Sequence, residues 1–236
     1  MCTGRNWQTC DTMNFAEMPE NGASFALSVS DVTFGTTMTE RLDWIGELSS
    51  RFESLRAVCV RNDSMDPDLF AMAASAAVNT GLPVILESCD PVCLREAAMT
   101  IQETSPLLCM TDPSALAETS LLSAVIGCPV AVPGADIETL MGNVESAESM
   151  GATGIVLNPM VRNMKTCLEL NTDLHRLRVE RSFPPACHPI MTRAWSGEYA
   201  LSMASVSVMR HGSLIVLDDL DEGCCEILDR IIVGCI

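Results

Sequence analysis

Hydrophobic and polar positions alternate along this chain in blocks of about two dozen residues. A short apolar run ends, an acidic or amide residue follows, and a stretch with apolar residues at helical spacing begins. Five junctions of this kind place Asp66, Asp90, Asp112, Asp136 and Asn158 at steps of 24, 22, 24 and 22 residues. A strand and a helix repeated at such steps are typical of a parallel α/β fold.

The predicted elements alternate between strand and helix along almost the whole chain. The strands are rich in Val, Ile and Leu and apolar on both faces, as expected for a parallel sheet covered by helices. The predicted strands are 25–32, 56–60, 84–86, 106–110, 128–132, 154–157, 188–191 and 213–217. The predicted helices are 39–52, 67–79, 91–103, 113–126, 137–150, 161–180, 197–210 and 223–233. This predicts a (β/α)8 TIM barrel, an α/β fold, as a single domain at residues 25–236 after an irregular lead-in at residues 1–24.

The residue at each junction has a structural role that competes with a functional one. Asp or Asn before a helix can accept a backbone N–H of the first turn as an N-cap. Pro follows directly at four of the five junctions, and Pro suits the first helical position, where its missing N–H costs nothing. A carboxylate that accepts backbone hydrogen bonds has a lowered pKa and is a poor proton shuttle. We therefore interpret Asp66, Asp90, Asp112 and Asp136 as caps, and leave Asn158 open between a cap and a ligand contact.

Composition limits the classes of partner. The chain has 31 acidic and 14 basic residues and a net charge of −17. Such a surface repels phosphate backbones and anionic lipid, so we expect neither nucleic-acid nor membrane binding. No apolar run approaches the ~20 residues that span a bilayer, and the start lacks an apolar signal core, so we expect a cytoplasmic protein. The 12 cysteines and 15 methionines favour free thiols in a reducing, anaerobic cell.

Polar residues at the ends of the predicted strands are the candidates for a site. In (β/α)8 barrels the active site lies at the C-terminal ends of the strands. There Asn62, Asp63, Glu87 and Asn158 are the candidate cofactor-binding residues, with a solvent-facing role as the alternative for Glu87. No residue is assigned as catalytic. No glycine-rich phosphate loop is present, and no cysteine or histidine spacing predicts a metal site.

Several segments, taken in order, resemble one known family. They are FALSVSD at 25–31, SMDPDLF at 64–70, LPVILESCDP at 82–91, SPLLCMT at 105–111, GIVLNP at 154–159, HPIM at 188–191 and HGSLIVL at 211–217. Their order and spacing resemble the barrel domain of the corrinoid iron–sulfur protein large (gamma) subunit, from the acetyl-CoA decarbonylase/synthase (CO dehydrogenase/acetyl-CoA synthase) family. The resemblance covers roughly residues 25–220.

The resemblance implies one-carbon metabolism in the acetyl-CoA pathway. In that family a methyl group passes from a methyl-tetrahydropterin to cobalt and then to acetyl-CoA synthase. The implied cofactor is a cobamide (corrinoid) shared with a partner. The implied partners are another barrel subunit, in a homo- or heterodimer, and a corrinoid-binding protein. The chain carries no iron–sulfur motif and no corrinoid domain, and it has Asn158-Pro159-Met160 where the family has Asp-Pro-Gly. We therefore expect a stand-alone, diverged form.

Three functions stay open on the sequence. The first is a barrel subunit that assists methyl transfer between methyl-tetrahydropterin, corrinoid and acetyl-CoA synthase. The second is an enzyme in its own right, a pterin-dependent corrinoid methyltransferase that holds the pterin with Asp63, Glu87 and Asn158. The third is a non-catalytic barrel that serves as a dimerisation or scaffold module.

Overall fold

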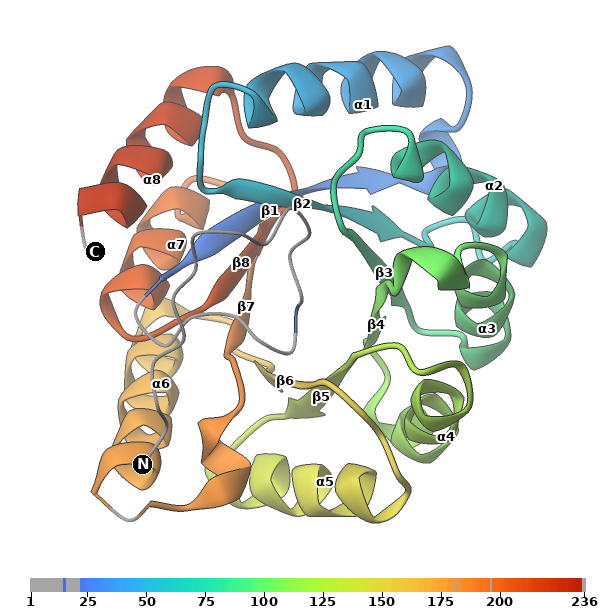
Figure 1. The fold of residues 1–236 in the computed structure, drawn as a ribbon. Helices are drawn as coiled ribbons and strands as arrows, with labels where there is room; N and C mark the ends of the chain where they lie inside the picture. The colour runs from blue at the N-terminus through green and yellow to red at the C-terminus, as the bar shows by residue number, and fades with distance from the viewer. Residues whose placement is uncertain (1–14, 16–21, 181, 196, 235–236) are drawn as a thin grey trace.

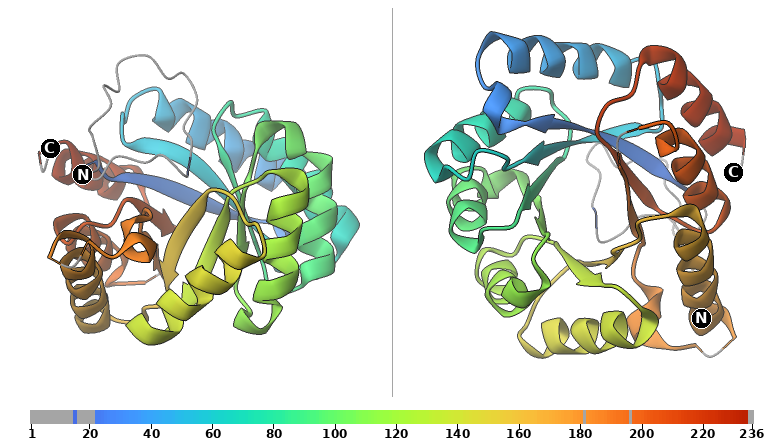
Figure 2. Two further views of the ribbon diagram at one scale, coloured as in Figure 1. Left: turned by 60° about the horizontal axis from the view of Figure 1, so that its bottom comes forward. Right: turned by 180° about the vertical axis from the view of Figure 1, so that it is seen from behind.

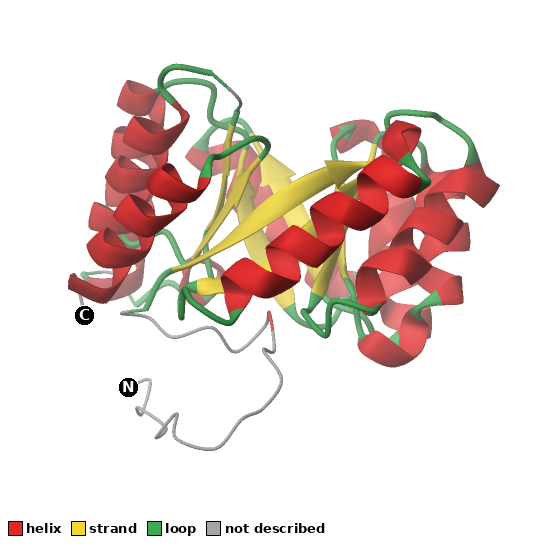
Figure 3. Ribbon diagram, turned by 90° about the horizontal axis from the view of Figure 1, so that it is seen from above, coloured by secondary structure: helices red, strands yellow, loops and turns green. Residues whose placement is uncertain are grey.

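The structure, a computed structural model, describes residues 15, 22–180, 182–195 and 197–234. In these residues eight strands alternate with eight α-helices, and the strands form a central barrel inside a ring of helices (Figure 1). The views from other sides show the helices outside the strands all around (Figures 2 and 3). The predicted (β/α)8 architecture is therefore confirmed.

The strands and helices are short, as the two-dozen-residue repeat requires. The strands are β1 (Ser24–Ser30), β2 (Leu55–Arg61), β3 (Val84–Ser88), β4 (Leu107–Met110), β5 (Val130–Gly134), β6 (Ile155–Pro159), β7 (Met191–Ala194) and β8 (Leu214–Leu217). The helices are α1 (Thr36–Ser49), α2 (Pro67–Val78), α3 (Pro91–Thr100), α4 (Leu116–Ile126), α5 (Ile137–Ser149), α6 (Met164–Val179), α7 (Ala200–Met209) and α8 (Glu222–Gly234).

The sheet is parallel and nearly closed. Its strand order is β6-β5-β4-β3-β2-β1-β8-β7. Between β6 and β7 the described residues form one bridge, Leu157 to Ile190, supported by a 2.7 Å hydrogen bond from Leu157 N to the Pro189 carbonyl. The seam between these two strands is therefore weaker than the seven laddered pairings.

The core has two parts because successive strand residues point to opposite faces. Outward residues such as Val58, Leu86 and Ile215 pack beneath the helices in one large buried cluster. Inward residues form a second, smaller cluster inside the barrel. The members of the inner cluster are Phe15, Ala26, Ala57, Cys59, Ile85, Leu107, Cys109, Ala131, Val156, Met191, Leu214 and Val216.

Four of the five junctions are helix caps, as predicted. The side chain of Asp66 accepts hydrogen bonds from the N–H groups of Asp68 and Leu69. Single backbone N–H groups are accepted by the side chains of Asp90, Asp112 and Asp136. These contacts satisfy first-turn donors that have no partner within the helix.

The fifth junction is different. Asn158 lies inside β6, and the N-cap of α6 is Asn163, whose side chain accepts the N–H of Thr166. The capping alternative for Asn158 is therefore wrong. The loop between the strand and the helix is longer here, so the repeat in the sequence matches the strand end and not the helix start.

The seventh strand begins later than predicted. The prediction placed it at 188–191, whereas β7 spans Met191–Ala194. Pro189 has no N–H for a sheet ladder, and the paired register starts with Met191 opposite Leu214. The shift matters because it moves Thr192 and Arg193 from a predicted loop into the strand itself.

Candidate functional site

The interior of the barrel changes from apolar to polar toward the C-terminal ends of the strands. On several strands a polar residue lies two positions after an inward apolar one, as in Ala26 and Ser28, or Val156 and Asn158. Since side chains repeat with a period of two in a strand, both members of each pair face inward. We call the resulting set the mouth cluster. Its members are Ser28, Cys59, Arg61, Glu87, Cys109, Asn158, Arg193 and Asp218.

Arg193 lies at the centre of the mouth cluster. Its side chain is only 8% exposed, and its Nη1 lies 3.0 Å from Glu87 Oε2. Its Nη2 donates to Asp218 Oδ1, and Nη1 also lies 3.8 Å from Cys59 Sγ. The guanidinium thus connects strands β2, β3 and β7 and the residue that follows β8. On its outer side Cζ lies 5.4 Å from the centre of the Trp195 ring, a distance compatible with a cation–π contact.

Arg61 extends this network to the edge of the mouth. Its Nη1 lies 3.2 Å from Asp218 Oδ1 and its Nη2 lies 2.9 Å from Asp63 Oδ2. Ser28 also donates to Asp218 Oδ1, at 2.8 Å. Asp218 therefore receives two guanidinium groups and a hydroxyl. Asp63 is 42% exposed, so its carboxylate lies where the network meets solvent.

Burial and the neighbouring charges together shift the pKa values of Glu87, Arg193 and Cys59. Burial raises the pKa of Glu87, although the positive charge of Arg193 opposes the rise. Burial alone would lower the pKa of Arg193, but Glu87, Cys59 and Asp218 raise it above its ordinary value. Burial also raises the pKa of the Cys59 thiol, with a further contribution from Glu87. The cluster therefore keeps Arg193 charged, holds Cys59 as a thiol, and brings Glu87 closer to neutrality than an exposed carboxylate.

Asn158 is a polar residue of the mouth cluster whose hydrogen-bonding capacity is largely unused. It is 7% exposed, and its Nδ2 makes a weak contact of 3.8 Å with Cys109 Sγ. Within the described residues its Oδ1 has no hydrogen-bond partner. An amide held in a strand with a free acceptor oxygen is suited to receive a hydrogen bond from a ligand.

Asn62 does not face the interior. Its Nδ2 donates to Ser88 Oγ at 2.8 Å, and its Oδ1 accepts the N–H of Met65 at 3.0 Å. It thereby ties the loop after β2 to the end of β3. The fully buried Asp31 holds the same loop by accepting the N–H groups of Asp63 and Ser64 and the Ser64 hydroxyl.

The four candidate residues are thus separated by the fold. Glu87 and Asn158 belong to the mouth cluster, Asp63 lies at its edge, and Asn62 is part of a loop anchor. The sequence reasoning missed the weight of Arg61 and Arg193. The period of two could have indicated Arg61, because it lies two residues after Cys59 at one predicted strand end. Arg193 also lies two residues after the predicted strand end at Met191, but the sequence did not show that it is inside the strand and reaches Glu87.

Large exposed apolar side chains surround the mouth. They occur in the loops that follow strands or in the first turn of the next helix, and all those positions lie at the same end of a parallel barrel. Each is at least 37% exposed. We call this set the rim. Its members are Val32, Phe34, Met65, Val92, Met164, Trp195 and Tyr199.

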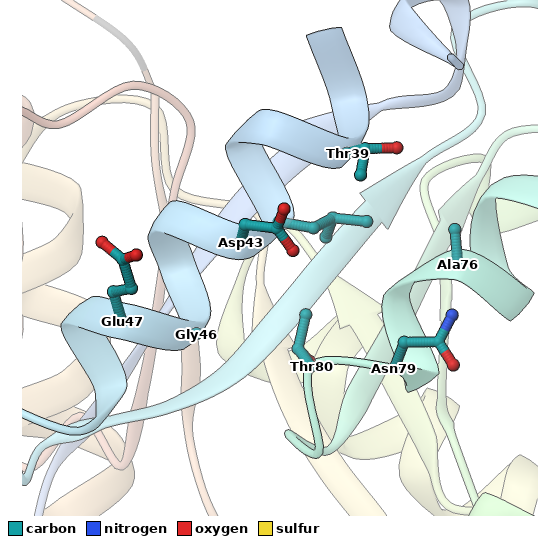
Figure 4. Close-up of a pocket in the computed structure, with 8 residues that line it drawn as sticks. Thr39, Asp43, Gly46, Glu47, Ala76, Asn79 and Thr80 are labelled. Atoms are coloured by element: carbon teal, nitrogen blue, oxygen red, sulfur yellow. The ribbon is translucent and has the colours of Figure 1, made fainter. Parts of the chain in front are cut away.

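Other features lie away from the mouth. No group of three or more His, Cys, Asp or Glu suited to a metal is found in the described part of the chain. His175 and His211 stack with ring centres 3.6 Å apart. A groove between α1 and α2 is lined by residues that include Asp43, Gly46 and Asn79 (Figure 4). None of the described helices is long and apolar enough to cross a bilayer.

The comparisons with known proteins agree with this architecture. A profile described as CO dehydrogenase/acetyl-CoA synthase delta subunit matches residues 19–229. The chain belongs to this family. Among curated relatives, it is 27% identical to the corrinoid/iron-sulfur protein large subunit of Moorella thermoacetica, over 82% of this chain and 45% of the relative. It is 34% identical to the acetyl-CoA decarbonylase/synthase complex subunit gamma of Methanothermobacter thermautotrophicus, over 45% of this chain and 23% of the relative.

Two further facts define the family relationship. This member of the CO dehydrogenase/acetyl-CoA synthase delta subunit family spans less than half the length of those two relatives. Its fold is similar to dihydropteroate synthase from Thermus thermophilus in complex with 6HMPPP, with a TM-score of 0.69 and 14% identity. That comparison covers 93% of this chain and 97% of the synthase. The predicted relationship to the corrinoid iron–sulfur protein is confirmed.

Proposed function

We propose that the chain is a barrel subunit that assists methyl transfer between a methyl-tetrahydropterin, a corrinoid and acetyl-CoA synthase. It would do so by presenting its mouth to a corrinoid that is held mainly by a partner protein. The observation that carries this proposal is the combination at one end of the barrel of an apolar rim and a polar floor. Family membership supports it, because the curated relatives are named as corrinoid/iron-sulfur and acetyl-CoA decarbonylase/synthase subunits.

The rim fits the edge and face of a large, partly apolar macrocycle. Trp195 and Tyr199, after β7, are 48% and 64% exposed, and Phe34 and Met65 offer further apolar surface from the loops after β1 and β2. Single exposed apolar residues are common on proteins, but a group that surrounds one opening indicates a binding surface. Covering this surface with a ligand and a partner would remove it from water, which is favourable.

The floor fits the amide side chains of a corrinoid. These amides donate hydrogen bonds, and Asn158 Oδ1 and the exposed carboxylate of Asp63 are acceptors at the mouth. Three carboxylates, those of Asp63, Glu87 and Asp218, face the two guanidinium groups of Arg61 and Arg193. The balance of three acids to two bases favours a ligand that donates hydrogen bonds or carries positive charge.

The residues of this chain would bind, orient and shield. The corrinoid, when bound, supplies the cobalt that carries the methyl group. The Glu87–Arg193–Asp218 arrangement would hold the floor rigid, because Arg193 is clamped on two sides. The rim would exclude water from the reacting face. The partners we propose are a corrinoid-binding protein and a second barrel, in a homo- or heterodimer.

A second candidate is a pterin-dependent corrinoid methyltransferase. Glu87 favours it, because a buried carboxylic acid with a raised pKa can carry a proton at the mouth for the leaving nitrogen of a pterin. The likeness to dihydropteroate synthases, some of them solved with pterin ligands, shows a shared fold. A third candidate is a barrel that acts only as a dimerisation or scaffold module.

Titration with methylcobalamin, alone and in the presence of a co-expressed corrinoid-domain protein, tests the first proposal. We expect a change in the visible cobalamin spectrum that Asn158→Ala weakens. Asn79→Ala is the matched control, because Asn79 lies in the groove between α1 and α2, outside the barrel. An unchanged spectrum under both conditions would favour the scaffold.

Methyl transfer distinguishes the second candidate. Methyl-tetrahydrofolate and cob(I)alamin are incubated with the protein, and methylcobalamin formation is followed by its absorbance. Turnover that is lost in Glu87→Gln supports an enzyme. Cobalamin binding without turnover supports the assisting subunit.

A further inference from the structure

A pair of sulfur atoms lies on the rim. The proposed function uses only the apolar surface of Met65 and assigns no role to Cys89 or to either sulfur atom as a ligand. Cys89 follows β3 and Met65 lies in the loop after β2, and Cys89 Sγ is 3.5 Å from Met65 Sδ. Among the described cysteines, Cys89 is the exposed one, while the others are buried or half-buried. Met65 is 49% exposed. Both sulfur atoms therefore belong to exposed side chains and face each other across two loops.

The loop that presents Met65 is held in an unusual conformation. Met65 has φ +60°, a left-handed backbone conformation that is uncommon for residues other than glycine. Its N–H is fixed by Asn62 Oδ1, and the preceding residue, Ser64, is held by the buried carboxylate of Asp31. The position of the thioether is therefore set by a hydrogen-bonded frame and does not depend on the Cys89 contact alone.

We propose that the facing sulfur atoms of Cys89 and Met65 bind a soft monovalent metal cation of the Cu(I) class. Thiolate and thioether are the protein ligands that soft ions select. Metal–sulfur bonds are about 2.3 Å long, so one ion can bond to two sulfur atoms 3.5 Å apart. Binding replaces the thiol proton by a metal–sulfur bond and the proton leaves to solvent, so no electron is transferred.

The surroundings favour a cation and differ from a zinc-type centre. Asp66 and Asp90 begin the two helices that follow these loops, and their carboxylates add negative charge near the pair. A structural zinc ion takes four ligands, whereas no group of three or more His, Cys, Asp or Glu that could hold a metal ion occurs in the described residues. A two-sulfur set suits an ion that accepts low coordination. This proposal is independent of the methyl-transfer function.

The test is an anaerobic titration of the reduced full chain with Cu(I) in competition with a chromophoric Cu(I) chelator. We expect wild type to bind one equivalent of Cu(I) more than Cys89→Ser does. The comparison with this variant also corrects for Cu(I) bound by the other cysteines, which both proteins share. Met65→Leu keeps the size of the side chain and removes the thioether, so the affinity of that equivalent should fall about tenfold or more. X-ray absorption of the loaded protein should show copper bonded to two sulfur atoms.

Matched controls use sulfur residues elsewhere on the surface. Cys224→Ser changes a half-buried thiol on α8, and Met99→Leu changes a thioether that is 48% exposed at the end of α3. Both should bind Cu(I) as wild type does. Equal affinity in wild type and Met65→Leu would overturn the proposal, as would equal stoichiometry in wild type and Cys89→Ser. Thermal unfolding of each variant checks that a loss of Cu(I) binding is not caused by a loss of the fold.

A measurement on wild type alone gives a second test. Iodoacetamide should alkylate Cys89 faster than the buried thiols, and one equivalent of Cu(I) should protect it in peptide mass spectra. Unchanged alkylation of Cys89 at that loading would contradict the site even if a variant failed to fold.

Discussion

The barrel interior is filled by apolar side chains at one end and by charged and polar side chains at the other. Toward the N-terminal ends of the strands the interior is filled by side chains such as Ala57, Leu107 and Leu214, all fully buried and apolar. Toward the C-terminal ends the same strands supply Arg61, Glu87 and other charged groups. The apolar layer gains free energy by leaving water. The polar layer loses hydration and must recover it through paired contacts.

The difference shows which layer is specialised. An apolar interior layer requires only volume and is sufficient to close a barrel. Buried ion pairs contribute little net stability, and apolar residues of similar size often do as well. Stability alone therefore does not explain the Arg193 network, since apolar residues could fill the same space. Its location at the mouth agrees with a binding role. The following predictions test that contrast, from the largest expected effect to the smallest.

Replacing Arg193 should cause the largest loss of stability. Arg193→Met leaves the buried Glu87 without a guanidinium partner and Asp218 with that of Arg61 alone, and breaking a buried pair by removing one partner costs about 3–5 kcal/mol. Urea unfolding followed by circular dichroism measures the loss. Arg95→Met is the control, because its contact with Glu96 is exposed and should contribute at most ~1 kcal/mol. Similar losses in both variants would refute the central role of Arg193.

Truncation in the apolar layer should cost nearly as much and leave ligand binding intact. Leu107 is fully buried at the start of β4, and Leu107→Ala should destabilise the fold by about 3 kcal/mol through lost burial and a residual cavity. The cobalamin response of the folded variant should match that of wild type. A response that disappears at a temperature where the variant is still folded would contradict the division between the two layers.

Glu87 should make stability depend on pH in the direction opposite to a carboxylate whose pKa is lowered by folding. Its pKa in the folded protein is raised above the ordinary value of 4.5, with burial as the main cause. The folded state therefore binds more protons than the unfolded state above about pH 4.5. Stability should fall as the pH rises from there through the folded pKa. The difference between wild type and Glu87→Gln in urea unfolding at several pH values isolates this effect, and a difference that does not change with pH would contradict it.

The helix cap of α6 should give the smallest of these effects. Asn163→Ala removes the side chain that accepts the N–H of Thr166 and should cost about 1 kcal/mol. Because Asn158 is not a cap, Asn158→Ala should weaken the cobalamin spectral change and lower the free energy of unfolding by less than Asn163→Ala does. Thermal or urea unfolding of both variants, paired with the cobalamin titration, separates the two roles. If Asn163→Ala changed the cobalamin spectrum as much as Asn158→Ala does, the assignment of Asn158 to ligand binding and of Asn163 to helix capping would be contradicted.

Much of the fold could be predicted from the sequence because local physics sets it. Apolar runs followed by capping residues predict each strand and helix, and Asp66, Asp90, Asp112 and Asp136 cap as expected. The prediction was wrong where local signals disagreed with pairing. Pro189 lies in a run that looks like a strand, but the ladder with β8 begins at Met191. Asn158-Pro159 looks like a helix start but continues β6.

The site was less predictable because it depends on contacts between distant strands. Glu87 and Asn158 could be named from their positions after apolar runs, and the structure places both in the mouth cluster. No local pattern predicts that Arg193 reaches Glu87, a residue more than 100 positions earlier in the chain. Nor does it show that Asn62 turns away to bind Ser88.

The sequence by itself therefore determined the alternation of strands and helices, the caps and the family relationship. The alternation and the caps follow from short-range periodicity and from side chains that hydrogen-bond to their own backbone neighbours. The family relationship follows from the resemblance of ordered segments along the chain. Only the tertiary structure decided which polar residues face the interior, because that depends on where each strand begins and on its register with the next. A shift of one residue in the pairing register sends a side chain to the opposite face, and the sheet as a whole fixes that register.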